Sequence, residues 1–286
     1  MLLYFDDEAD FAARLAQAAG REARRVARHR FPDGEIKLTL PPSLPPSVVV
    51  LRSLHCPNEK LVELVLLADT ARDLGARELT LVAPYLAYMR QDTAFHPGET
   101  ISQRIIGRLL AGRFNRVVTV DPHLHRVSSL AEAVPATQAI ALTAAPLIGA
   151  FCAGRKRMPV LLGPDSESEQ WVKAAAGASL EFAVCTKHRE NDHDVRIELP
   201  AIPLAGRDVV LLDDVASTGG TLLQCARKAL SAGAARVDAA VTHALLDATA
   251  LARIGAAGIG ELVSTDTVPH SSNRISVVQL IAGALK

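Results

Sequence analysis

The 286-residue chain has no net charge, because 31 lysines and arginines balance 31 aspartates and glutamates. A chain without a net field has no general attraction to nucleic acid or to an anionic membrane. It also lacks an apolar run of membrane-spanning length, and its acidic first ten residues do not resemble a secretion signal. We therefore expect a cytoplasmic protein that binds small molecules or further copies of itself, with no nucleic-acid partner and no membrane.

Cysteine is scarce, and the four that are present lie far apart without forming a Cys-x-x-Cys pair. This spacing indicates neither a zinc knuckle nor a disulfide framework. Cys56, Cys152, Cys185 and Cys225 are instead expected to be buried thiols in a reducing compartment. Hydrophobic residues make up 49% of the chain, which suffices for one large core or two ordinary ones, and two domains are the starting expectation.

Short apolar runs rich in β-branched residues recur along the chain and suit strands that are buried on both faces. They cover residues 48–51, 79–83, 117–120, 160–162, 209–212 and 237–241. Helical patterns lie between them, most clearly at 58–74, where Asn58 can cap the helix and Gly75 can end it. Alternating strands and helices predict an α/β fold with mainly parallel sheets flanked by helices.

A weak internal repeat, the internal echo, relates residues 74–77 to residues 232–236, since the pattern of each predicts a helix end followed by a strand. The echo is consistent with two similar halves, and equally with the ordinary use of glycine wherever a helix leads into a strand. The best boundary falls at 139–145, which gives an N-terminal domain at 1–142 and a C-terminal domain at 143–286.

The most informative segment begins where the strand at 209–212 runs into two carboxylates, a hydroxyl-rich turn and a helix. Paired glycines at a helix N-terminus present bare N–H groups to a phosphate monoester, and nearby hydroxyls add donors. The acid pair suits vicinal sugar hydroxyls, bound directly or through a cation. The pattern therefore predicts a site for a phosphorylated pentose. Its members are Asp213, Asp214, Ser217, Thr218, Gly219, Gly220 and Thr221.

An acidic βα turn of this kind can also be a merely structural turn, but here acids, hydroxyls and glycines occur in one block. The block resembles the phosphoribosyl diphosphate-binding motif of type I phosphoribosyltransferases and of ribose-phosphate diphosphokinases. The resemblance implies two similar domains of the type I phosphoribosyltransferase fold.

Further segments favour the diphosphokinase branch, because they resemble that family's motifs and occur in its order. They are 30–35, 84–92, 121–123, 163–165 and 186–189, and 242–243 and 266–269 extend the match. By resemblance, this family forms phosphoribosyl diphosphate and AMP from ribose 5-phosphate and ATP.

The resemblance also assigns the adenine and metal sites. Phe31, Asp33 and Glu35 reach into a neighbouring subunit to hold adenine, which implies a homodimer or a higher homo-oligomer. Arg90, Gln91 and Asp92 complete the ATP site from their own subunit. His123 and Asp165 are implied metal ligands. The implied ion is Mg²⁺, although an imidazole ligand would suit Mn²⁺ better. His125 and His243 are interpreted as supporting or core histidines.

Lys187 and Arg189 lie in a polar run that is typical of a catalytic flap. By resemblance, they steady the negative charge that develops on the transferred group and on the leaving phosphate.

The chain departs from most family members at two places. Ser217 stands where an aspartate is usual, and residues 166–171 replace a glycine-rich basic turn. Residues 98–102 and Ser217 instead resemble the archaeal-type subgroup. Two alternatives stay open from the sequence. One is a phosphoribosyltransferase with another acceptor, and the other is a non-catalytic paralogue that partners a true diphosphokinase.

Overall fold

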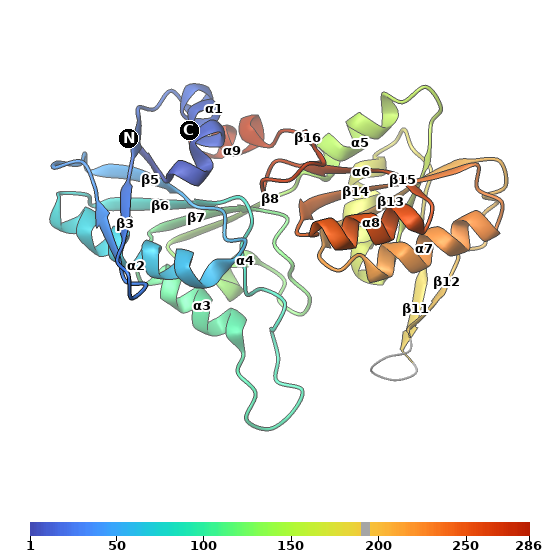
Figure 1. Ribbon diagram of the computed structural model, residues 1–286, viewed down its shortest axis with the longest axis horizontal. Helices are drawn as coiled ribbons and strands as arrows, with labels where there is room; N and C mark the ends of the chain where they lie inside the picture. The colour runs from blue at the N-terminus through green and yellow to red at the C-terminus, as the bar shows by residue number, and fades with distance from the viewer. Residues whose placement is uncertain (190–194) are drawn as a thin grey trace. The chain divides into compact units, whose positions relative to one another are not determined.

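The computed structural model describes residues 1–189 and 195–286, and the side chains at 187–189, 195 and 196 lie outside the described set. The chain forms two compact units (Figure 1). Unit 1 comprises Met1–Leu142 and Val277–Lys286, and unit 2 comprises Thr143–Ser276. Within the described residues, no helix is long and apolar enough to cross a membrane.

Unit 1 is built on a parallel six-stranded sheet in the order β2-β1-β5-β6-β7-β8. Its strands are β1 (Leu2–Tyr4), β2 (Ala23–Arg25), β5 (Ser47–Leu51), β6 (Glu78–Ala83), β7 (Arg116–Val120) and β8 (Gln138–Leu142). Its helices are the short η1 (Asp6–Glu8), α1 (Ala9–Ala19), α2 (Pro57–Asp73), α3 (Ser102–Ala111), α4 (Leu130–Ala133) and α9 (Val278–Ala284). A separate antiparallel hairpin joins β3 (Ala27–Arg30) to β4 (Ile36–Thr39).

Unit 2 has a second parallel six-stranded sheet, in the order β10-β9-β13-β14-β15-β16. Its strands are β9 (Val160–Gly163), β10 (Phe182–Val184), β13 (Asp208–Ala216), β14 (Arg236–Ala244), β15 (Ile259–Thr265) and β16 (Asn273–Ile275). Its helices are α5 (Ala145–Ala153), the short η2 (Ser166–Ser168), α6 (Glu169–Ala176), α7 (Gly220–Ser231) and α8 (Ala248–Ala256). The antiparallel pair β11 (Thr186–Arg189) and β12 (Val195–Glu198) extends away from this sheet (Figure 1).

Strand alternation places the core of unit 2 on both faces of its sheet. Leu162, Val209 and Leu211 lie in one cluster with buried residues of α7 and α8. Leu161 and Val210 lie in the other, with buried residues of α5 and α6. The apolar runs of the sequence are therefore strands covered on both sides by helices, as expected for a parallel sheet.

The two units repeat one order of elements, which confirms the predicted fold class. In each, a βα unit and an edge strand precede the antiparallel hairpin, and a second strand then enters a long helix, α2 or α7. The segments of the internal echo occupy the same place in both units, at the helix end before β6 and before β14. Gly75 and Gly233 both take positive φ there, +107° and +88°.

Several details differ from the expectations. The last ten residues, expected in the second domain, belong to unit 1, where α9 packs against α1 and β7. Cys56 is exposed rather than buried, and it lies at the N-cap of α2 with φ of 50°. The helix begins at Pro57, and the Asn58 carboxamide oxygen accepts a hydrogen bond from the Tyr88 hydroxyl instead of capping it.

Candidate functional site

The predicted ribose-phosphate segment lies at the carboxyl end of β13 and the start of α7. The strand continues through both carboxylates to Ala216, four residues further than the apolar run indicated. Gly219 adopts the left-handed conformation (φ +72°), and a Cβ there would come within 2.7 Å of Ile254 Cγ2. Both facts require glycine at this position. The turn therefore brings the first N–H groups of the twelve-residue α7 next to the end of the strand.

Three carboxylates crowd this edge of unit 2. Asp213 is half-buried, and Asp165 and Asp214 are 8% and 2% exposed. Burial, Asp214 and Asp165 together raise the pKa of the Asp213 carboxyl well above its ordinary value. The Asp214 N–H donates to Asp213 Oδ1 at 3.0 Å, and the Val215 N–H donates to Asp214 Oδ1 at 2.7 Å. The cluster can accept hydrogen bonds from sugar hydroxyls, and its mutual repulsion suits a divalent cation.

The donors expected for a phosphate lie in the same turn. Ser217 and Thr221 are half-buried, whereas Thr218 is exposed. The Gly220 N–H lies 3.5 Å from Thr218 Oγ1, so the hydroxyl is next to the helix N-terminus. Hydroxyls, backbone N–H groups and the positive end of a helix suit a phosphate group.

Asp165 also has a structural task, as the N-cap of η2. Its Oδ1 accepts from Glu167 N (3.2 Å) and Ser168 N (3.3 Å), and the Ser168 hydroxyl donates to the Asp165 carbonyl at 2.5 Å. Trp171 lies in the core at 7% exposed. The unusual 166–171 segment thus forms a capped turn and the start of α6, with the carboxylate of Asp165 at its head.

The flap residues Lys187 and Arg189 lie on β11, which pairs with β12. Their side chains lie outside the described residues, so their roles stay predictions.

In unit 1, the predicted adenine residues lie together at the tip of the β3–β4 hairpin. The Phe31 N–H donates to the Glu35 carbonyl at 2.8 Å, and the Glu35 N–H donates to Asp33 Oδ1 at 3.1 Å. Phe31 is 39% exposed, and its ring meets His29 edge-on at 4.7 Å. The tip therefore presents an exposed aromatic face next to two carboxylates.

The remaining ATP-site candidates lie between β6 and α3. Arg90 is exposed, and Gln91 is half-buried, with its Nε2 donating to the Thr93 carbonyl at 2.9 Å. The Asp92 side chain is fully buried, and its two oxygens accept from Arg126 Nη1 (2.6 Å) and Arg126 N (3.1 Å). Asp92 therefore links its own loop to the loop of unit 1 that carries Arg126. The sequence did not reveal this use because the partners are 34 residues apart.

His123 lies beyond β7 with its ring against His125, the centroids 4.3 Å apart and the planes at 69°. The Nε2 atoms of the two rings face each other, so the pair can share a proton or a cation. His125 thus joins His123 more directly than the sequence indicated. His243 lies in the core of unit 2 at 1% exposed, with its Nδ1 2.8 Å from Thr267 Oγ1, as a core histidine should.

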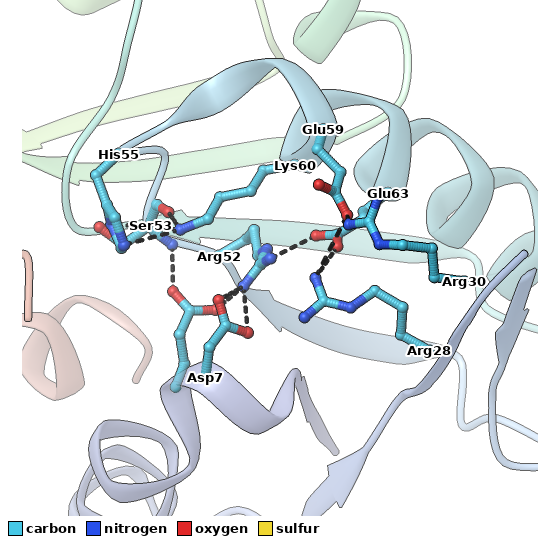
Figure 2. Close-up of polar contacts among 10 residues, drawn as sticks. Asp7, Arg28, Arg30, Arg52, Ser53, His55, Glu59, Lys60 and Glu63 are labelled. Carbon is cyan, nitrogen blue, oxygen red and sulfur yellow. Dashed lines mark hydrogen bonds and ion pairs between the residues drawn. The ribbon is translucent and has the colours of Figure 1, made fainter. Parts of the chain in front are cut away.

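The sequence reasoning missed a dense charged cluster between α2, the ends of β1 and β5, and the β3–β4 hairpin (Figure 2). Arg52, which is 1% exposed, is its centre and contacts Asp7, Glu8 and Glu63. A signal existed in the sequence, because Glu59 and Glu63 have the i, i+4 spacing of one helix face. We call this set the Arg52 cluster. Its members are Asp7, Glu8, Arg28, Arg30, Arg52, Ser53, His55, Glu59, Lys60 and Glu63.

Solved structures show a chain of the same architecture. The phosphoribosylpyrophosphate synthetase from Mycobacterium smegmatis superposes with a TM-score of 0.87 over 100% of this chain and 97% of its own, at 24% identity. The fold is therefore an α/β fold built from two phosphoribosyltransferase-like units.

Sequence comparisons give the family. Residues 1–112 match the N-terminal domain of ribose phosphate pyrophosphokinase, and residues 199–282 match the phosphoribosyl synthetase-associated domain. A ribose-phosphate pyrophosphokinase from Methanopyrus kandleri is 36% identical over 96% of this chain and 94% of its own. A ribose-phosphate pyrophosphokinase from Halobacterium salinarum is 35% identical over the full length of both. The chain belongs to the ribose-phosphate pyrophosphokinase family.

Proposed function

We propose that the protein transfers the β,γ-diphosphoryl group of ATP to the C1 hydroxyl of ribose 5-phosphate, giving phosphoribosyl diphosphate and AMP. The observation that carries the proposal is the β13–α7 turn, where three carboxylates and a helix N-terminus adjoin. A diol and a phosphate monoester carried by one small molecule match these two features. The full-length relatives favour this activity over a phosphoribosyltransferase or a non-catalytic paralogue.

In this proposal, Asp213 and Asp214 accept hydrogen bonds from the ribose hydroxyls. Ser217, Thr218 and Thr221 and the N–H groups of Gly219 and Gly220 hold the 5-phosphate. Lys187 and Arg189 act from the β11–β12 hairpin, where they stabilise charge on the transferred group and exclude water.

The adenine ring is held against the Phe31 face, with the Asp33 and Glu35 carboxylates accepting from its amino group. We propose that this hairpin serves the site of a second subunit, which makes a homodimer or a higher homo-oligomer the active form. Arg90 and Gln91 complete the ATP site, and Asp92 supports the loop that carries them through its pair with Arg126.

The acidic edge of unit 2 fits a metal, because repulsion among its carboxylates raises the Asp213 pKa and a divalent cation would relieve it. Asp165 is the proposed ligand in unit 2, and His123 is the proposed ligand in unit 1. Mg²⁺, or Mn²⁺ with the imidazole, would neutralise phosphate charge when bound. A cytoplasmic location completes the proposal, since ATP and ribose 5-phosphate are cytoplasmic metabolites.

Substitution of Asp214 tests the sugar-binding role. We expect Asp214→Asn to weaken ribose 5-phosphate binding about ten- to a hundredfold, since a hydrogen bond to a charged group contributes roughly 1.5–3 kcal/mol. Titration calorimetry measures the affinity directly. Asp208→Asn is the matched control, because Asp208 lies at the other end of β13 and the substitution removes the same charge. An affinity changed less than twofold by Asp214→Asn would exclude the proposed role.

A further inference from the structure

The β3–β4 hairpin needs support from outside itself. Its strands have four residues each, and β3 and β4 form a two-stranded sheet of their own. Isolated two-stranded hairpins are marginally stable in water. The tip at 31–35 nevertheless carries Phe31, Asp33 and Glu35, the three residues proposed to hold adenine. Something must therefore fix the direction in which this tip points.

The hairpin has two distinct faces. Arg28 pairs with Leu38 and Arg30 pairs with Ile36, so the two arginines alternate with His29 along β3. Successive side chains of a strand point to opposite faces, which puts Arg28 and Arg30 on one face and His29 on the other. The edge-on contact between His29 and Phe31 keeps the adenine-binding ring on the His29 side. Holding the arginine face thus presents the aromatic face outward.

Helix α2 holds the arginine face with two carboxylates one turn apart (Figure 2). Glu59 accepts a hydrogen bond from Arg30 Nη2 and lies 4.0 Å from Arg28 Nη1. Glu63, with a fully buried side chain, accepts from Arg28 and pairs with Arg52 Nη2 at 2.5 Å. Positive and negative groups therefore alternate from the tip inward, in the order Arg30, Glu59, Arg28, Glu63, Arg52.

Arg52, at the inner end of this row of alternating charges, is held by contacts with other parts of unit 1. Arg52 Nη1 lies 2.8 Å from Asp7 Oδ2 and 3.1 Å from Glu8 Oε2. Its guanidinium lies 4.4 Å from the centroid of the Phe5 ring. The Ser53 N–H donates to Glu8 Oε1 at 2.5 Å. The outer end is open, because the Glu59 and Arg30 side chains are 41% and 53% exposed. Glu59 can thus be changed without opening the core.

We propose that Glu59 is a positioning residue for nucleotide binding, acting through Arg28 and Arg30 to orient the adenine-binding tip. This inference rests on the proposed function and deepens it. Glu59 contacts no substrate in this scheme. Its loss lets the hairpin sample other directions, so that nucleotide binding must order it again. The effect falls on ATP and spares ribose 5-phosphate, whose proposed residues lie in unit 2.

The test compares Glu59→Gln with the wild-type protein in steady-state assays of AMP formation. We expect the KM for ATP to rise about three- to tenfold, with kcat and the KM for ribose 5-phosphate within about twofold of wild type. Glu59→Asp keeps the charge and should recover most of the change. Asp69→Asn is the matched control, because Asp69 lies on the same helix and pairs at 3.8 Å with Arg113 instead of the hairpin. It should leave all three parameters unchanged.

Four results separate the outcomes. A selective rise in the KM for ATP, absent from Asp69→Asn, supports the positioning role. An unchanged KM for ATP in Glu59→Gln, or an equal change in Asp69→Asn, overturns it while the proposed function stands. Parallel changes in kcat, both KM values and the melting temperature also overturn it, because they indicate a structural role. Absence of AMP formation by the wild-type protein is a different failure, that of the proposed function itself.

Discussion

Asp213 is the residue at which ligand binding and folding make opposed demands. The proposed ribose contact needs a carboxylate, while burial and the neighbouring Asp214 and Asp165 disfavour its charge and raise its pKa. Sites that are organised for binding commonly lose stability in this way. The sequence identified the acid pair, but it did not show the burial of Asp213, which is the largest cause of the raised pKa, or the nearby Asp165, 48 positions earlier in the chain.

The raised pKa of Asp213 sets the direction in which folding stability changes with pH. The folded protein holds a proton on Asp213 at pH values where the unfolded chain has lost it, so stability falls as pH rises from the ordinary carboxyl pKa through the raised one. Asp213→Asn should therefore increase the free energy of unfolding at pH 7 by about 0.5–2 kcal/mol, and the gain should vanish near pH 3.5. Urea unfolding at the two pH values measures this. A variant less stable than wild type at pH 7 would contradict it.

Asp92 and Asp165 show the limit of residue-by-residue prediction. Both were assigned to ligand sites by resemblance, and both also have structural partners, Arg126 and the η2 backbone. A carboxylate that caps a turn and one that binds a ligand look alike in a sequence. Only the fold shows which oxygen atoms already have partners.

At the scale of elements, apolar runs located β5, β6, β7, β9, β13 and β14, because strands covered on both faces are uniformly hydrophobic. The hairpin strands β3 and β11 escaped notice because they carry charged residues, and the three-residue β1, β2 and β16 are too short to show a period. β13 was cut short at its first carboxylate, although hydrogen bonding to β14 continues to Ala216. The carboxylates of the proposed site were therefore mistaken for the end of the strand.

His55, in the segment joining β5 to α2, is expected to make the folding stability depend on pH. Burial, Lys60 and Arg52 lower the His55 pKa to about 4, and Asp7 opposes the shift. Lys60 Nζ lies 3.1 Å from His55 Nε2 and donates to the Ser53 carbonyl at 2.7 Å. Neutral imidazole is therefore part of the folded structure, whereas the unfolded chain takes up a proton near pH 6.5.

Because the folded pKa is depressed, stability is lost as pH falls from about 6.5 toward 4. We expect the step from pH 7 to pH 5 to cost the wild-type protein about 1–2 kcal/mol more than it costs His55→Gln. Paired urea titrations of the two proteins give this difference and cancel the contributions of other groups. Identical pH dependence in both proteins would contradict this, because it would show that His55 takes up its proton equally in the folded and unfolded states.

At the scale of the whole molecule, the sequence predicts a boundary at 139–145, before the helix expected near Pro146, and unit 2 begins at Thr143. The sequence did not predict that α9 belongs to unit 1, since this depends on contacts with residues more than 150 positions earlier. Arg21 Nη2 donates to the Leu285 carbonyl at 3.2 Å, and Arg116 Nη2 donates to the Ala284 carbonyl. No local pattern encodes such contacts.

The two units have the same order of elements, but equivalent positions in them carry different side chains. The β13–α7 junction of unit 2 ends in carboxylates and a glycine turn, while its counterpart in unit 1, between β5 and α2, is filled by the Arg52 cluster. The same place in the fold thus holds the proposed ligand site in one unit and a network of buried ion pairs in the other. This supports a sugar phosphate in unit 2 and a nucleotide-binding hairpin in unit 1.

The most direct test of the account is the identity of the products formed by the purified protein with Mg²⁺, ATP and ribose 5-phosphate. Phosphorus NMR should show AMP and phosphoribosyl diphosphate appearing in equal amounts, with no AMP when either substrate is omitted, because the proposed attack occurs at the β-phosphorus of ATP. ADP in place of AMP would mean attack at the γ-phosphorus and would contradict the account. So would the absence of nucleotide turnover combined with diphosphate release from phosphoribosyl diphosphate and a base, which is transferase activity.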